Sequence, residues 1–277
     1  MEFSLGPFEL VGDRVWRAVA EPASVNIGLV AGRDGCVVID TGSTPAQGRE
    51  IRDAAARVAG FPVVAAVVTH AHYDHAFGLA AFADLPTYAH ASVWPTIEAE
   101  ASDEELAHLG LKRTDLAAAT HPFKLAAMVD LGDRHVEVVH FGPGHTPGDA
   151  VALVPDARVV FAGDLIENPA PYASSDSTLS GWPLALDGVL GTLRADSVIV
   201  GGHGDPVDRV FAVNQRGQLA GIYLQLEYLF QCGTSLAHVV AKGDWPFPDD
   251  HFAGAVARVH AELKAKGKIG RPLKVIH

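Results

Sequence analysis

The sequence predicts an α/β fold in which helices cover β-sheet, arranged as one sandwich with a C-terminal helical extension. Three observations lead to this prediction. Short apolar strand-like runs alternate with helical segments over residues 14–82 and again over residues 135–200. The hydrophobic share of 48% and the charged share of 19% suit a well-packed domain of 277 residues. After residue 208 the apolar residues recur at helical spacing.

The first half of the chain begins with strands and continues as helix, strand and helix. Apolar segments divided by Gly and Asp turns predict strands over residues 14–19, 25–30 and 36–40. Thr44 followed by Pro45 is typical of a helix start, and we expect this helix to continue to about Val58. Residues 63–68 then predict a strand, and residues 77–82 favour a second helix.

Residues 92–118 depart from this alternation and are helical in character. Ser102 followed by three acidic residues is typical of a helix N-terminus. We expect a helical insertion here, either a lid over a functional site or a surface helix pair.

The β pattern resumes near residue 134, and one more helix precedes the last strand. The segments that predict strands are residues 135–140, 150–154, 158–162 and 197–200. Pro155-Asp156 lies between the second and third of these segments and predicts a hairpin turn. A helix near Leu184–Leu193 leads into the last strand.

Charge and composition argue against several function classes. A net charge of −12 disfavours a nucleic-acid partner, which would require clustered Lys and Arg. The N-terminus has no basic segment followed by an apolar one, and no apolar run is long enough for a membrane span. We therefore expect a cytoplasmic protein without a membrane partner. Cys36 and Cys232 lie in apolar surroundings, and we expect two buried free thiols.

The segment Thr69–His75 carries the strongest chemical signal in the sequence. It reads Thr-His-Ala-His-Tyr-Asp-His, which places three histidines and one aspartate within six positions directly after an apolar strand. Imidazole and carboxylate groups are ligands that suit zinc and similar cations. The pattern therefore predicts a metal site at this strand end.

Three later residues share this placement after an apolar strand and beside glycine. His145 lies in Gly-Pro-Gly-His-Thr-Pro-Gly, Asp164 follows Val-Val-Phe-Ala-Gly, and His203 follows Val-Ile-Val-Gly-Gly. Glycine allows the backbone to approach a ligand closely. With the first cluster, these residues supply five histidines and two aspartates, which is enough for two metals.

The order of these motifs resembles that of the metallo-β-lactamase-fold hydrolases. His-x-His-x-Asp-His is followed by Gly-His-Thr-Pro-Gly, Gly-Asp and Gly-His-Gly, and Asp40 in Val-Ile-Asp-Thr-Gly is similar to the first motif of that superfamily. The resemblance extends from about Val25 to Pro206. It implies a four-layer αβ/βα sandwich with the site at the sheet edge between its halves. The predicted catalytic domain is residues 1–207, with the insertion at about 92–118, and residues 208–277 form the C-terminal helical extension packed on it.

The resemblance also implies a centre of two zinc ions, with iron or manganese as alternative metals. One metal would be held by His70, His72 and His145, the second by Asp74, His75 and His203, with Asp164 bridging both. Asp40 would orient the site through hydrogen bonds. Asp74 would be catalytic as well, because it would orient the metal-bridging hydroxide that attacks the substrate. Aromatic residues that are candidates for a substrate pocket are Tyr73, Tyr172, Trp182 and, in the insertion, Trp94.

The implied reaction is hydrolysis of an ester, thioester or lactone of a small molecule. Asp164 disfavours β-lactamase as the main activity, since true metallo-β-lactamases usually have Cys or Ser there. Glu167 weakens the resemblance to acyl-homoserine lactonases, which carry Tyr at that position. A glyoxalase II-like enzyme would bind substrate through basic C-terminal residues such as Lys264, Lys266, Lys268, Arg271 and Lys274. The remaining alternatives are a mononuclear iron persulfide dioxygenase, a phosphodiesterase and a weak β-lactamase, and the oligomeric state stays open.

Overall fold

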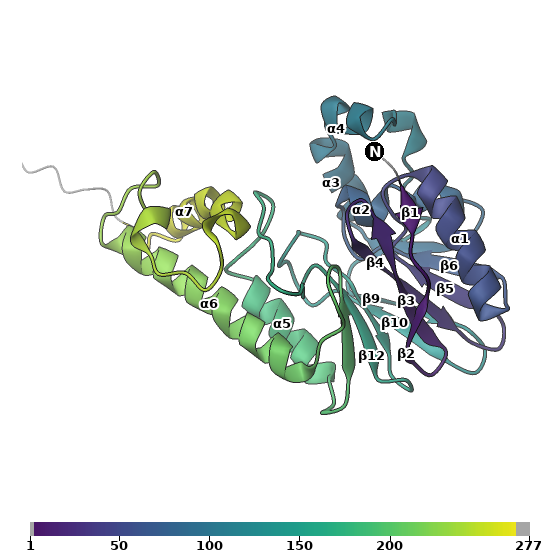
Figure 1. Cartoon of the computed structure of the whole chain (residues 1–277). Helices are drawn as coiled ribbons and strands as arrows, with labels where there is room; N and C mark the ends of the chain where they lie inside the picture. Colours follow the sequence, from purple (N-terminus) through teal and green to yellow (C-terminus); the bar gives the residue numbers. More distant parts are fainter. Residues whose placement is uncertain (1–2, 270–277) are drawn as a thin grey trace, which may run out of the picture.

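The computed structural model describes residues 3–269 and contains two β-sheets with helices against their outer faces (Figure 1). The first sheet has the order β1 (Ser4–Leu5), β3 (Val15–Glu21), β4 (Val25–Ala31), β5 (Cys36–Ile39), β6 (Val63–Val67), β7 (Thr87–His90) and β8 (His121–Phe123), with β2 (Glu9–Gly12) also paired to β3. The second has the order β13 (Val198–Gly201), β12 (Val159–Gly163), β11 (Val151–Val154), β10 (His135–Val139) and β9 (Ala126–Asp130).

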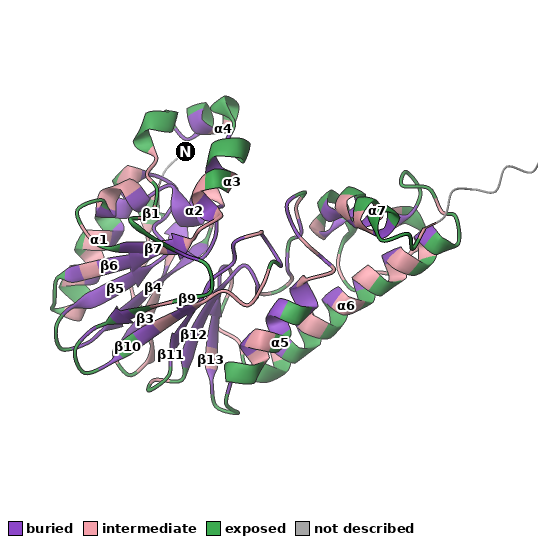
Figure 2. Ribbon diagram, turned by 180° about the vertical axis from the view of Figure 1, so that it is seen from behind, coloured by how far each residue is buried: buried purple, intermediate pink, exposed green. Residues whose placement is uncertain are grey.

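The helices are distributed over both outer faces and the C-terminal part. They are α1 (Pro45–Ala59), α2 (Tyr73–Ala76), α3 (Val93–Glu100), α4 (Asp103–His108), α5 (Trp182–Thr192), α6 (Arg209–Gln231) and α7 (Val256–Ala265). Short 3₁₀ turns cover Leu79–Phe82, Arg113–Asp115, Val240–Lys242, Asp249–His251 and Ala253–Ala255. Figure 2 shows buried strands in the middle of the molecule and exposed outer faces on α1 and α6. No helix among residues 3–269 is long and apolar enough to cross a membrane.

The four layers follow from the two-residue side-chain period of each strand. In β5, Cys36 and Val38 belong to the core beneath α1, whereas Val37 and Ile39 belong to the core between the sheets. In β12, residues 160 and 162 face the helical side, and residues 159 and 161 face the first sheet. Both strands are therefore buried on both faces, as the predicted αβ/βα sandwich requires.

The helix starts follow the predicted capping signals. Pro45 is at the start of α1, and the Thr44 side chain accepts a hydrogen bond from the Gln47 backbone N–H. Gly60 ends this helix in the left-handed region, with φ of 72°. Ser102 caps α4 in the same way through the N–H of Glu105. The predicted helix near 184–193 is present as α5 and starts two residues earlier, at Trp182.

Two sequence expectations about the C-terminal part are wrong in detail. The segment after α6 is less helical than its apolar spacing suggests, because Gly233, Pro246 and Pro248 interrupt it before α7 begins. Cys232 is exposed, since it follows the last residue of α6, whereas Cys36 is buried as expected. Arg271 and Lys274 lie outside the described residues. The division at residues 207 and 208 stays a prediction.

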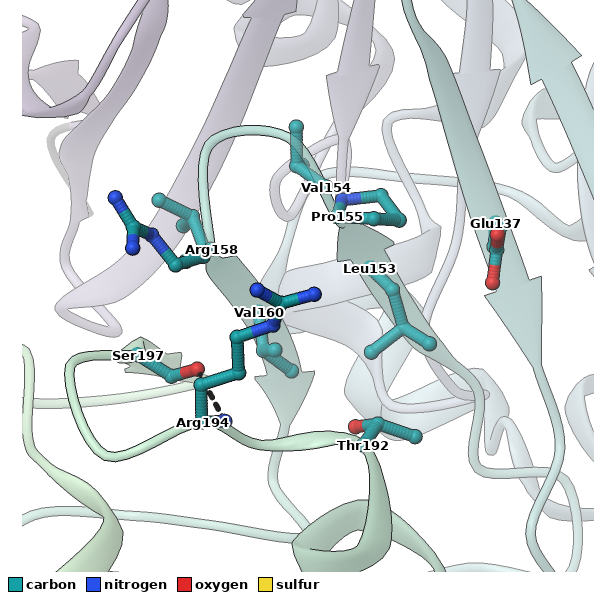
Figure 3. A pocket seen from close by; sticks show the side chains of 10 residues that line it. Glu137, Leu153, Val154, Pro155, Arg158, Val160, Thr192, Arg194 and Ser197 are labelled. Atoms are coloured by element: carbon teal, nitrogen blue, oxygen red, sulfur yellow. Dashed lines mark hydrogen bonds between the residues drawn. The ribbon is translucent and has the colours of Figure 1, made fainter.

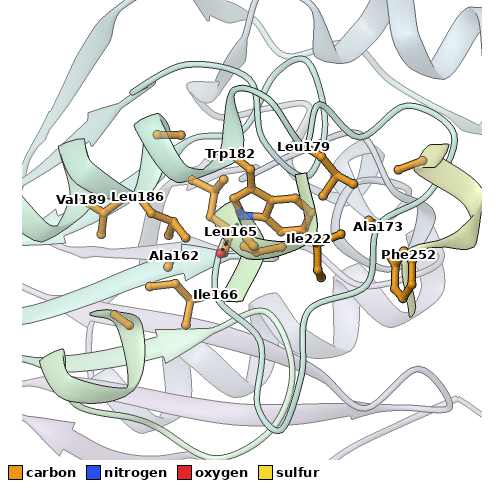
Figure 4. Close-up of a cluster of buried hydrophobic side chains, with 14 of the residues drawn as sticks. Ala162, Leu165, Ile166, Ala173, Leu179, Trp182, Leu186, Val189, Ile222 and Phe252 are labelled. Carbon is orange, nitrogen blue, oxygen red and sulfur yellow. Dashed lines mark hydrogen bonds between the residues drawn. The ribbon is translucent and has the colours of Figure 1, made fainter. Parts of the chain in front are cut away.

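Trp182 anchors the core between the second sheet and α5 and α6 (Figure 4). Its side chain has no exposed surface, and its Nε1–H donates to the Leu165 carbonyl oxygen at 3.0 Å. Leu186 of α5 and Ile222 of α6 belong to the same core. The ring therefore joins the helical layer to the loop after β12.

We expect Trp182→Ala to lower the free energy of unfolding by about 3–5 kcal/mol, because it leaves a cavity in this core. Urea unfolding followed by circular dichroism measures the change. Trp182→Phe is the matched control and should cost less, because the Leu165 carbonyl oxygen still accepts a hydrogen bond from Gln215 Nε2 at 2.9 Å. A loss below about 1 kcal/mol in the alanine variant would contradict this role for Trp182.

Candidate metal centre

The strands of both sheets deliver polar side chains to one edge of the sandwich. β5 and β6 run parallel in the first sheet, and β12 and β13 run parallel in the second, so their C-terminal ends coincide. The residues just beyond these ends are Asp40, His70, Asp164 and His203, and His145 lies in the loop between β10 and β11. The fold thus explains why residues far apart in the sequence meet.

Backbone hydrogen bonds join the two sheets at this edge. Ala150 N–H donates to the carbonyl oxygen of Thr69 at 2.7 Å, and Asn26 N–H donates to that of Gly202 at 2.7 Å. The Asn26 side-chain amide also donates to the carbonyl oxygen of Gly201 at 2.9 Å. These bonds fix the loops of one sheet relative to those of the other.

Seven side chains meet here in two groups. The first group is His70, His72, His145 and Asp164, and the second is Asp74, His75 and His203. Within each group, the nitrogen and oxygen atoms that could bind a cation all lie within 4.8 Å of one another. The structure therefore brings together all seven residues that the sequence predicts as metal ligands.

Asp164 lies between the two groups. Its Oδ2 is 3.3 Å from His145 Nε2 in the first group, and its Oδ1 is 3.2 Å from His75 Nε2 in the second. The position depends on Gly202, because a side chain there would overlap the Asp164 carboxylate. One carboxylate thus contacts both groups.

Hydrogen bonds on the outer side of the rings orient four of the five histidines. In each of these rings the outer atom is Nδ1. His70 Nδ1 is 3.1 Å from Thr69 Oγ1, and His75 Nδ1 is 2.8 Å from Asp40 Oδ2. His145 Nδ1 is 2.9 Å from the Tyr172 carbonyl oxygen, and His203 Nδ1 is 3.2 Å from the Ser24 carbonyl oxygen. Carbonyl and carboxylate oxygens only accept hydrogen bonds, so Nδ1 of His75, His145 and His203 carries the proton and Nε2 presents its lone pair inward. The Thr69 hydroxyl donates its proton to Asp40, so it too accepts from His70 Nδ1. This is the tautomer that binds a cation through Nε2.

Asp40 connects the ends of β5 and β6 through its side chain. It is buried, with a left-handed φ of 63°, and its Oδ1 accepts a hydrogen bond from the Thr69 N–H at 2.8 Å. Its Oδ2 accepts from His75 Nδ1. The same carboxylate therefore fixes both the loop that carries the cluster and one ring of it.

The electrostatics keep His70, His145 and Asp164 in the forms that bind cations, whereas nearby carboxylates outweigh burial and raise the pKa of His72, His75 and His203, so a cation would displace a proton from those rings. Burial lowers the pKa of His145 to about 4 and holds the pKa of His70 well below its usual value, so both imidazoles are neutral at pH 7. Burial opposes ionisation of Asp164, but His75, His70 and the other surrounding histidines outweigh it and hold the pKa of this carboxyl well below its usual range. Asp164 is therefore ionised.

Several buried polar atoms in this cluster have no hydrogen-bond partner among the described residues. They include His70 Nε2, His75 Nε2 and Asp164 Oδ1. Leaving such atoms unpaired costs free energy, and all three belong to residues of the two groups. The donor set and its unpaired atoms therefore fit divalent cations.

Two buried carboxylates lie near the cluster, and the sequence did not predict either of them there. Asp176 is buried, and its Oδ2 is 3.5 Å from His72 Nε2. Glu167 is buried and accepts a hydrogen bond from the Tyr172 N–H at 3.0 Å. Asp176 lies in a Ser-Ser-Asp-Ser run that looks like an ordinary loop, so its spacing gives no signal of this contact.

The aromatic pocket candidates have different environments. Tyr73 lines a cavity of about 150 Å³ beside His72, together with Phe77, Ile97 and Glu105. Trp94 lines a separate apolar cavity of about 270 Å³. Tyr172 is half exposed and contacts the centre through its backbone, whereas Trp182 is fully buried and packs behind His145 instead of lining an open cavity.

A further cavity lies away from the centre. It has a volume of about 210 Å³ and includes Glu137, Arg158 and Arg194 (Figure 3). It is next to the end of β11 and the start of β12, opposite the strand ends that carry the cluster. Of these three cavities, the one beside His72 is lined by a residue of the cluster, and the other two are not.

A family profile described as the metallo-beta-lactamase superfamily matches residues 20–206. The chain belongs to this superfamily. Among its relatives, the probable metallo-hydrolase YqgX of Bacillus subtilis (strain 168) is 26% identical over 219 residues, covering 76% of this chain and 99% of that protein. Acyl-coenzyme A thioesterase MBLAC2 of Bos taurus is 34% identical over 170 residues, covering 51% of this chain and 58% of that protein.

The solved structures agree with the fold of this superfamily. Metallo-beta-lactamase FIM-1 of Pseudomonas aeruginosa, in its mono-zinc form, matches with a TM-score of 0.65 at 22% identity, covering 80% of this chain and 96% of that one. This likeness confirms the predicted sandwich. The family match and the hydrolase relatives identify this superfamily member as a metal-dependent hydrolase.

We expect Asp40→Asn to weaken metal binding by about 10- to 100-fold, because the neutral amide holds His75 Nδ1 less firmly. Competition with a chromophoric chelator measures the dissociation constant. Asp53→Asn, on the exposed face of α1, is the matched control and should bind metal like the parent protein. Equal affinity in the two variants would show that Asp40 does not orient the centre.

Proposed function

We propose that this protein is a dinuclear zinc hydrolase that cleaves a thioester or ester of a small molecule with an apolar acyl group. The observation that carries the proposal is the pair of His/Asp groups joined by Asp164, with a partly apolar cavity beside His72. The similarity to a protein named as an acyl-coenzyme A thioesterase supports the thioester. The lactone and the cytoplasmic location stay predictions from the sequence.

In this proposal the two groups hold one cation each. His70, His72 and His145 would hold the first, Asp74, His75 and His203 would hold the second, and Asp164 would contribute to both. Imidazole and carboxylate ligands suit zinc, and iron and manganese remain alternatives. When bound, such cations would supply Lewis acidity, which lowers the pKa of bound water and polarises a substrate carbonyl group.

We assign Asp74 the role of orienting the attacking water. Its carboxylate is buried, and its Oδ2 is 3.3 Å from His203 Nε2, which leaves Oδ1 as the atom that accepts a hydrogen bond from water. Surrounding histidines outweigh the effect of burial and lower the pKa of Asp74, so it accepts that bond as a carboxylate. The protein thereby supplies an acceptor on one side of the nucleophile.

The cavity beside His72 suits the acyl part of the substrate. Tyr73, Phe77 and Ile97 give it apolar walls, and Glu100 and Glu105 contribute carboxylates. Negative charge at this position disfavours the phosphates of a coenzyme A head group. We therefore place the acyl chain in this cavity and the leaving group outside it.

The protein loaded with zinc should hydrolyse acyl thioesters or p-nitrophenyl esters and contain two zinc ions per chain. Elemental analysis gives the metal content, and a panel of thioester, ester, lactone, β-lactam and phosphodiester substrates gives the activity. His72→Ala and Asp164→Ala should each lose metal and at least 100-fold in kcat/KM while remaining folded by circular dichroism, because each removes a ligand.

Two results would overturn the assignment. Full metal content in either variant would mean that the ligand set is wrong. One iron per chain together with oxygen-dependent oxidation of a persulfide would replace hydrolysis by the dioxygenase alternative.

The proposed acyl site can be tested through chain-length selectivity. Ile97→Trp fills the cavity, so we expect kcat/KM to fall by at least 10-fold for longer acyl chains and to change little for acetyl substrates. Thr96→Ser, at a neighbouring position that also lines the cavity, is the control and should keep the parent profile. A uniform loss for all chain lengths would place the acyl group elsewhere.

A further inference from the structure

We propose that Asp176 is a positioning residue for the centre, holding the His72 ring so that its Nδ1 faces the cations. The proposal further assigns the C-terminal segment of residues 249–262 the role of holding Asp176 in place. It rests on the proposed metal pair and adds to it a residue outside the predicted ligand set.

His72 differs from the other four histidines in its orientation. Its Nδ1 is 2.8 Å from His145 Nε2, so Nδ1 is the inward atom, and Nε2 faces outward. A ring that binds through Nδ1 must carry its proton on Nε2. His72 therefore needs an acceptor near Nε2, where the other rings need one near Nδ1.

Packing alone does not fix this ring. The His72 side chain is 29% exposed, whereas those of His70 and His145 are 1% and 2% exposed. A partly exposed imidazole can rotate or change tautomer, and the tautomer protonated on Nδ1 cannot bind a cation there. An oriented acceptor removes that freedom before the metal arrives.

Asp176 supplies the acceptor. Its Oδ2 is 3.5 Å from His72 Nε2 and makes no hydrogen bond within the described part of the chain, so it is free to accept one from that ring. Its Oδ1 accepts a hydrogen bond from the Ser174 hydroxyl. The carboxylate is 5% exposed, and an ionised buried oxygen without a donor costs free energy, so the His72 Nε2–H is its natural partner.

The loop that carries Asp176 also contacts a second histidine of the centre. The Tyr172 carbonyl oxygen accepts a hydrogen bond from His145 Nδ1 at 2.9 Å. The Ser177 hydroxyl donates to the His145 carbonyl oxygen at 2.6 Å. One loop therefore orients two rings of the first group.

The C-terminal segment fixes this loop from the other side. Arg258 of α7 donates to the carbonyl oxygen of Asp176 at 3.1 Å. Ala173 N–H donates to the carbonyl oxygen of His251 at 2.6 Å, and His251 Nδ1 is 3.1 Å from the Pro171 carbonyl oxygen. These hydrogen bonds connect α7 and His251 to the loop that carries Asp176.

The test compares Asp176→Ala, which removes the acceptor, with Asp176→Asn, which keeps a neutral acceptor oxygen in the same shape. We expect zinc dissociation constants about 100-fold weaker for Ala and about 10-fold weaker for Asn, measured by chelator competition. Asp187→Asn, which only breaks a surface pair with Arg216, is the matched control and should bind zinc like the parent.

Long-range ¹H–¹⁵N spectra of the metal-free protein report the tautomer of His72, which would not change if Asp176 only stabilised the loop. The parent should show His72 protonated on Nε2, and Asp176→Ala should show a mixture of tautomers. Arg258→Gln should change the tautomer populations of His72 in the same direction by a smaller amount and leave those of the other four histidines unchanged.

The outcomes separate this inference from the proposed function. Parent protein that binds two zinc ions, together with unchanged affinity and tautomer in Asp176→Ala, would overturn the role of Asp176 alone. Parent protein that binds no zinc would overturn both proposals. If Asp176→Ala does not fold, the Asn variant decides, and parent-like zinc affinity in it would overturn the inference.

Discussion

The contact of one buried carboxylate with both histidine groups is the constraint on which this structure depends. Asp164 is in reach of His145 on one side and His75 on the other, and its charge is taken out of water. A buried charge is tolerated only where opposite charge or donors surround it. The sandwich provides this environment at the single edge where parallel strand ends of both sheets coincide. Gly202 then keeps the space that the carboxylate occupies.

The hydrogen bonds on the outer side of the rings turn this cluster into a binding site of defined shape. An imidazole has two nitrogens, and a cation site needs one lone pair from each ring in a known direction. Main-chain carbonyl oxygens accept the hydrogen bond that orients the rings of His145 and His203, whereas the Asp40 carboxylate accepts the one that orients His75. Because most of these acceptors belong to the backbone or to buried side chains, the fold itself selects the tautomers.

The sequence predicted the seven clustered residues because each follows an apolar strand or lies in a glycine-rich loop, and those features are local. It also predicted the sandwich, through strand and helix alternation and through the order of motifs. Asp176 could not be found in this way, since its meeting with His72 depends on how a loop of the second half folds over the first. The exposure of Cys232 likewise depends on where α6 ends, which apolar spacing alone does not determine.

Residues outside the family match contact the loop beside the metal centre. The superfamily profile ends at residue 206, yet Arg258 and His251 contact the loop that carries Tyr172 and Asp176. Residues beyond the family match therefore contribute contacts around the first group. In the same way, the cavity beside His72 is walled partly by α3, within the predicted insertion, through Ile97 and Glu100. The clustered side chains are thus placed by the strand ends of the sandwich, whereas the surroundings of His72 are built by α3 and by the loop that α7 contacts.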